Sequence, residues 1–85
     1  MTPTLTHPLD THTFTRVTVG PLTLWWSYED CVAFQTPDAN RPYAAEGLNL
    51  SPTTRRHIES LGNSWELSPE RFNDALASVI DRYTK

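Results

Sequence analysis

The sequence predicts a small α+β domain in which an antiparallel sheet of about four strands is covered on one face by a C-terminal helix, with a short helix at one end. Short alternating stretches, several rich in β-branched residues, recur between residues 12 and 50, and two Ser-Pro pairs, at residues 51 and 68, each begin a helical pattern. With 85 residues, the chain has room for one domain whose single core is only just sufficient. Such a domain gains burial by binding a partner or a second copy of itself, so a homodimer is one of the expected states.

Residues 1–11 show neither a helical nor a strand period and mix prolines with hydroxyl residues. We therefore expect a flexible N-terminal arm followed by one domain at residues 12–85. His7, Asp10 and His12 lie in or next to this arm, but their spacing lacks the regularity of structural zinc sites. The sequence predicts no metal and no cofactor.

A β-hairpin is predicted at Gly20-Pro21, because this pair separates two alternating stretches. In the second stretch, residues 22–28, Trp26 shares a face with the leucines and Trp25 points to the opposite face. Two interpretations of Trp25 follow. Either another segment of the chain covers it, or it is an aromatic anchor for a partner.

A third strand is expected at residues 31–35, with Val32 and Phe34 facing the core. Cys31 then lies on the opposite face as an inert thiol, since nothing in the spacing brings a base such as His57 next to it. The following loop, residues 36–42, is rich in turn formers, and exposed loops of this kind often carry function.

A fourth, weaker strand at residues 43–50 leads to the first helix, expected at about 52–61. Ser51 is a good N-cap, Pro52 suits the first helical position, and Gly62 is a typical helix stop. The start of this helix concentrates hydroxyls, cations and an imidazole. It is either an anion-binding corner that uses the helix amides and dipole, or a capped structural helix with solvated arginines.

A second helix is expected at about 69–83, after the second Ser-Pro pair. Its apolar residues recur at helical spacing and form one stripe, which we expect to cover one face of the sheet. The stripe contains Phe72, Ala75, Leu76, Val79, Ile80 and Tyr83. Between the helices, residues 64–67 form either a fifth edge strand or an extended connector.

The overall charge and composition narrow the classes of partner. The net charge is −3, from ten acidic and seven basic residues, so a nucleic-acid partner is not expected. No apolar run is long enough to span a membrane, and the N-terminus lacks the features of a secretory signal. With a single cysteine, the chain is expected to be cytoplasmic, with a reduced thiol.

Two segments resemble a known family. Residues 27–34 (Ser-Tyr-Glu-Asp-Cys-Val-Ala-Phe) and 51–58 (Ser-Pro-Thr-Thr-Arg-Arg-His-Ile) are similar to a strand and a helix start found in an uncharacterised group of small bacteriophage and mobile-element proteins. The resemblance implies a phage origin and a small α+β fold. It implies no activity, so no catalytic residue comes with it.

The sequence contains no paired carboxylates, nucleophile elbow, zinc spacing or glycine-rich cofactor loop, so no enzyme is predicted. The leading hypothesis is a non-enzymatic phage accessory protein that binds and inhibits a host protein in the host cytoplasm, such as an anti-CRISPR-like inhibitor of host defence. The alternative is a binder that sequesters a nucleotide or another phosphorylated signal at the first helix start. The predicted binding residues are Trp25, Tyr28, Thr53, Thr54, Arg55, Arg56 and His57.

Overall fold

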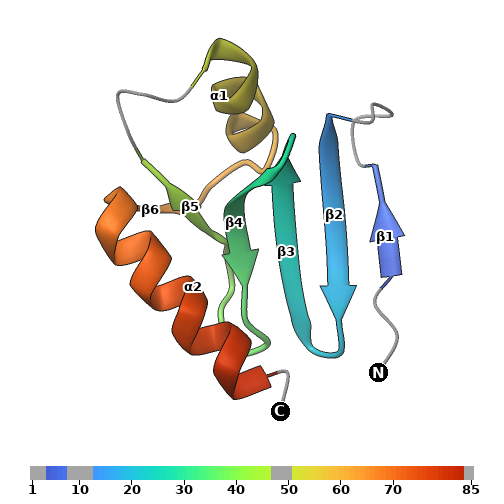
Figure 1. Cartoon of the computed structure of the whole chain (residues 1–85), viewed down its shortest axis with the longest axis vertical. Helices are drawn as coiled ribbons and strands as arrows, with labels where there is room; N and C mark the ends of the chain where they lie inside the picture. The colour runs from blue at the N-terminus through green and yellow to red at the C-terminus, as the bar shows by residue number, and fades with distance from the viewer. Residues whose placement is uncertain (1–3, 8–12, 47–50, 84–85) are drawn as a thin grey trace.

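The computed structural model describes residues 4–7, 13–46 and 51–83. They form a six-stranded sheet and two helices, which confirms the predicted α+β class with more strands than the expected four or so (Figure 1). The strands are β1 (Thr4–Thr6), β2 (Phe14–Val19), β3 (Leu22–Ser27), β4 (Asp30–Gln35), β5 (Tyr43–Ala45) and β6 (Trp65–Leu67). The helices are α1 (Pro52–Glu59) and α2 (Pro69–Tyr83).

The strands lie in the sheet in their sequence order. Each strand from β1 to β5 is antiparallel to the next, whereas β6 is parallel to β5. A parallel pair needs a crossover connection, and α1 lies in the connection between these two strands. The extended segment predicted at residues 64–67 is thus an edge strand.

β1 is where the structure differs from the predicted flexible arm. Leu5 pairs with Val17 of β2, so Thr4–Thr6 belongs to the sheet. The strand was not predicted because three residues are too few to show a period, and the pairing is provided by the free edge of β2. Residues 1–3 and 8–11 of the predicted arm lie outside the described residues.

The hairpin between β2 and β3 is confirmed. Val19 pairs with Leu22, and Gly20 adopts a φ of 57°, in the left-handed region that glycine enters without a steric penalty. A second positive φ of 57° occurs at Tyr28, in the turn between β3 and β4. A non-glycine residue in this conformation is strained, and the structure holds it there with a hydrogen bond from its amide to the Thr13 carbonyl, at 2.8 Å.

A β-bulge in β4 overturns the predicted arrangement of that strand. Trp25 pairs with Ala33 and Trp26 pairs with Cys31, which leaves Val32 as an extra residue. Val32 therefore packs with Trp25, on the face opposite Phe34, and Cys31 packs on the same face as Phe34. The strict alternation expected for residues 31–35 is wrong because a bulge shifts the side-chain period by one residue.

Both faces of the sheet are covered, whereas the sequence predicts a cover on one face only, because the crossover between β5 and β6 carries α1 onto the second face. The first face packs Leu22, Leu24 and Phe34 against Phe72 of α2, which runs along the β4–β6 side of the molecule (Figure 1). The second face packs Phe14, Trp25, Val32, Ala33 and Ala44 against Ile58 and Leu61, from α1 and the turn that follows it. Two small cores, one on each face, hold the domain together.

The helix boundaries follow the predicted signals. α1 begins at Pro52 after the N-cap Ser51, ends at Glu59, slightly before the predicted end, and is followed by Gly62 at a φ of 78°. α2 has the predicted bounds, although Ile80 of its predicted apolar stripe is 38% exposed. Neither helix is long and apolar enough to cross a membrane.

Candidate functional site

At the start of α1, where the sequence predicts an anion-binding site, the capping residues hydrogen-bond to one another. The Ser51 hydroxyl accepts a hydrogen bond from the Thr54 amide at 3.1 Å and donates one to Thr54 Oγ1 at 3.0 Å. Pro52 has no amide hydrogen, and the Arg55 amide donates to the Ser51 carbonyl at 3.0 Å. The Thr54 and Arg55 amides are therefore satisfied within the helix start and are not free for an anion.

A chain of hydroxyls continues from this cap into the protein. Thr54 Oγ1 lies 2.9 Å from Ser27 Oγ at the end of β3, and Ser27 Oγ lies 2.7 Å from His57 Nδ1. One order of donation uses every hydroxyl proton: Ser51 to Thr54, Thr54 to Ser27, and Ser27 to His57. In this order Nδ1 is an acceptor and the imidazole is neutral.

His57 is a core residue. It is 4% exposed, it stacks on Phe14 with ring centroids 4.7 Å apart, and it lies 6.2 Å from the Tyr28 ring. Burial lowers the pKa of His57, which favours the neutral form. The Ser27–His57 pair has the spacing of a nucleophile and its base, but Ser27 is 1% exposed, so a substrate cannot reach its hydroxyl in this conformation.

The other predicted binding residues fall into two groups. Trp25 is 8% exposed and lies in the second-face core, as expected if another segment of the chain covers it, which leaves little of its ring for a partner. Tyr28, Arg55 and Arg56 are exposed, and Thr53 is half-buried. The structure thus brings the predicted residues near one another but leaves few of them available to a ligand.

Cys31 and His7 have different surroundings: one is a half-buried thiol and the other lies beside the backbone of β2. Burial raises the pKa of the Cys31 thiol to about 11, and the thiol lies on the face opposite His57. His7 Nδ1 lies 3.3 Å from the Phe14 carbonyl oxygen, whereas Asp10 and His12 are outside the described residues. Within the described ranges, no three His, Cys, Asp or Glu side chains are grouped as metal ligands.

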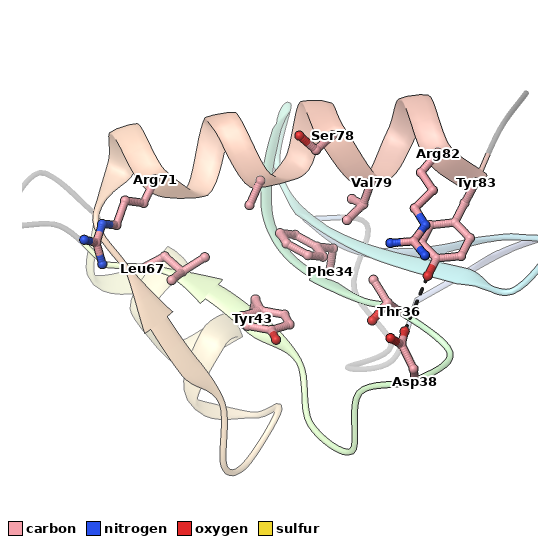
Figure 2. A pocket seen from close by; sticks show the side chains of 11 residues that line it. Phe34, Thr36, Asp38, Tyr43, Leu67, Arg71, Ser78, Val79, Arg82 and Tyr83 are labelled. Atoms are coloured by element: carbon pink, nitrogen blue, oxygen red, sulfur yellow. Dashed lines mark hydrogen bonds between the residues drawn. The ribbon is translucent and has the colours of Figure 1, made fainter.

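The structure shows a second candidate site, a groove between α2 and the sheet (Figure 2). We call it the α2 groove; its volume is about 480 Å³. Its lining residues come from β4, β5, β6, α2 and the loop between β4 and β5: Phe34, Thr36, Asp38, Tyr43, Leu67, Arg71, Ala75, Ser78, Val79, Arg82 and Tyr83. The volume is typical of a ligand-binding pocket.

The middle of the α2 groove is mainly apolar, and its charged groups lie at its ends. Phe34, Leu67 and Val79 lie between Arg71 at one end and Arg82 at the other (Figure 2). The Tyr83 hydroxyl donates a hydrogen bond to Asp38 Oδ1 at 3.4 Å, which links the C-terminal end of α2 to the loop between β4 and β5. This arrangement suits a ligand that is apolar in the middle and polar at its ends.

A series of aromatic rings supports one wall of the α2 groove. Phe34 contacts both Phe72 and Tyr43, with ring centroids 5.5 Å and 5.3 Å apart. Tyr43 in turn lies 4.8 Å from Trp65, over which the Arg41 guanidinium sits at 5.0 Å. Because the rings extend from the buried Phe72 to the exposed edge strand, the wall is anchored in the first-face core.

No protein-family model, curated protein or solved structure matches this chain. The resemblance to phage proteins therefore stays a prediction. The candidate site rests on geometry alone.

The sequence does not predict the α2 groove, although it indicates two of its parts separately. The loop at residues 36–42, which supplies Thr36 and Asp38, has the composition of an exposed loop of the kind that often carries function. The helix stripe includes Val79 and Tyr83. Nothing in the sequence indicates that these two segments face each other, because that contact depends on how α2 crosses the sheet.

Proposed function

We propose that this chain is a non-enzymatic binding protein whose α2 groove receives a short, mainly apolar segment of another protein. The observation that carries the proposal is an apolar groove with an arginine at each end, Arg71 and Arg82 (Figure 2). Arginine presents a planar set of donors that suits a carboxylate. The partner segment is therefore apolar in its middle and carries an acidic group.

The length of the α2 groove favours a peptide segment as its occupant. Arg71 and Arg82 are three turns apart on α2, which corresponds to roughly 16 Å along the helix axis. An extended peptide covers this distance with about five residues. The groove also has aromatic side chains in its lining, Phe34, Tyr43 and Tyr83, and aromatic residues are enriched where protein interfaces bury apolar groups.

Two features support a role without catalysis. The hydrogen bond from the Ser27 hydroxyl to the His57 imidazole lies in the interior, where it joins α1 to β3. The thiol of Cys31 has a raised pKa and is therefore a poor nucleophile at neutral pH. Both groups contribute to the cores rather than to a reactive surface.

The narrower proposal is that the partner is a host protein, bound and inhibited by a phage protein in the cytoplasm. It rests on the resemblance of residues 27–34 and 51–58 to phage proteins. The alternative of a nucleotide held at the start of α1 is less well supported, because the Ser51 hydroxyl bonds to Thr54 and the Thr54 hydroxyl bonds to Ser27.

The proposal is tested by selecting random peptides, displayed on yeast, for binding to the purified protein. Val79→Trp fills the α2 groove, whereas Ala77→Trp places the same ring at an exposed position of α2 that does not line the groove. We expect the selected peptides to share an apolar centre and to lose at least about tenfold in affinity for Val79→Trp. Ala77→Trp should bind them normally.

Thermal melts of both variants control for folding. Equal binding of the selected peptides to wild type and to a folded Val79→Trp would contradict the proposal. A selection that yields no peptide with an apolar centre would contradict it as well.

A further inference from the structure

The two ends of the α2 groove differ in charge. At one end, Arg71 makes no hydrogen bond, ion pair or ring contact with any other residue that the structure describes. At the other end, Arg82 shares its surroundings with an acid and a phenol, Asp38 and Tyr83 (Figure 2). The groove therefore has one cation without a counter-charge and one cation with a counter-charge.

Asp38 is held as a carboxylate beside Arg82. Its pKa is lowered mainly by a hydrogen bond from the Thr36 hydroxyl, then by its own backbone amide, and further by Tyr83 and by the charge of Arg82. Arg82 also lies 5.5 Å from the centroid of the Tyr83 ring. The net charge of this end is close to zero at neutral pH, so it does not attract a second carboxylate.

Building on the proposed function, we propose that the α2 groove binds its partner segment in one direction, with a single carboxylate at Arg71 and a neutral hydrogen-bond donor at Asp38. Asp38 is then the residue that determines specificity, because it masks Arg82. The partner is an apolar segment with an acidic residue at one end only.

Charge complementarity gives this direction its physical basis. A peptide carboxylate gains a forked, charge-assisted hydrogen bond from Arg71, whereas at the other end it meets the Asp38 carboxylate at short range. A neutral amide or hydroxyl at that end can donate to Asp38, since a carboxylate accepts about four hydrogen bonds and Thr36, Tyr83 and the Asp38 amide supply three of them. Reversing the peptide would lose both interactions.

Asp38→Asn tests the inference because it removes the charge and keeps the shape and the acceptor oxygen. The same display library is selected on wild type, Asp38→Asn and Arg71→Gln. Asp74→Asn, at an exposed position of α2 outside the groove, makes the same change in net charge and serves as the control. Thermal melts confirm that each variant is folded.

We expect wild type and Asp74→Asn to select peptides with an acidic residue at one end. Asp38→Asn should select acids at both ends and should bind such peptides about fivefold more tightly than wild type does. Arg71→Gln should lose the preference for an acid. If apolar peptides are selected but every variant shows the same distribution of acids, the inference fails and the proposed function stands.

If no peptide is selected at all, the proposed function fails and the inference fails with it. If Asp74→Asn gains acids at both ends to the same degree as Asp38→Asn, net charge alone explains the effect. That result would also overturn the role assigned to Asp38.

Discussion

On the α1 side of the sheet the polar side chains bond to one another, whereas on the α2 side they surround an open groove. Ser27, Thr54 and His57 form hydrogen bonds in the interior, with Ser27 and His57 almost fully buried. Arg71 and Asp38 are exposed at opposite ends of the apolar α2 groove. The segment richest in reactive residue types thus builds the fold, and the proposed binding surface forms from residues that no sequence motif singles out.

The largest expected effect concerns the core beneath α2. Phe72→Ala should lower the free energy of unfolding by about 3–5 kcal/mol, because Phe72 is 2% exposed and fills the space between α2 and the sheet. Chemical denaturation followed by tryptophan fluorescence measures the change. Phe72→Leu, which keeps most of the buried surface, should cost clearly less, and equal losses for the two variants would argue against tight packing there.

A smaller loss is expected on the α1 side from Ser27→Ala. The substitution leaves His57 Nδ1 and the Thr54 hydroxyl without their shared partner, which should cost about 1–3 kcal/mol of stability. Ser78→Ala, at an exposed serine beside the α2 groove, should change stability by less than about 0.5 kcal/mol. Equal stability losses for Ser27→Ala and Ser78→Ala would contradict the view that only the α1 side depends on buried hydrogen bonds.

The stability of the α1 side should depend on pH through His57. Burial lowers its pKa below the ordinary value of 6.5, so the unfolded chain binds a proton more readily than the folded protein does. The stability that neutral, buried His57 contributes is fully present above pH 6.5. It is lost as the pH falls below 6.5 toward the pKa of His57 in the folded protein. The free energy of unfolding should therefore decrease as the pH is lowered from about 7.5 to about 5.

His57→Gln provides the comparison for this titration, since glutamine stays neutral and the other histidines are unchanged. Wild type should lose more stability on acidification than the variant does. Parallel pH profiles for the two proteins would show that His57 does not titrate against folding.

The sequence predicts the local features of this fold well. The Gly20-Pro21 hairpin, the Ser51 cap of α1 and the bounds of α2 were all predicted, because each depends on residues within a few positions of one another. The bulge at Val32 was not predicted, since it is a matter of register between β3 and β4. Residue patterns within one segment predict its backbone conformation but not the register with which two strands pair.

The candidate site could be predicted only in part for the same reason. Strand alternation correctly separated Trp25 from Trp26, but the sequence does not show that α1 covers the second face and buries Trp25. In the same way, Tyr43 and Tyr83 are distant in sequence and line one groove only because α2 crosses the strands. Contacts between segments decide which of the predicted side chains stay exposed.

The central claim is that partners bind on the α2 side and not at the α1 corner. Two matched double variants test it most directly: Arg71→Ala with Arg82→Ala, and Arg55→Ala with Arg56→Ala, which remove the same charge from exposed arginines on the two helices. The measurement is the affinity of acid-bearing selected peptides for each variant. The account predicts a loss of about fivefold or more for the Arg71 and Arg82 pair and no change for the Arg55 and Arg56 pair. A loss of affinity for the Arg55 and Arg56 pair, with no change for the Arg71 and Arg82 pair, would contradict this claim and would indicate binding at the start of α1.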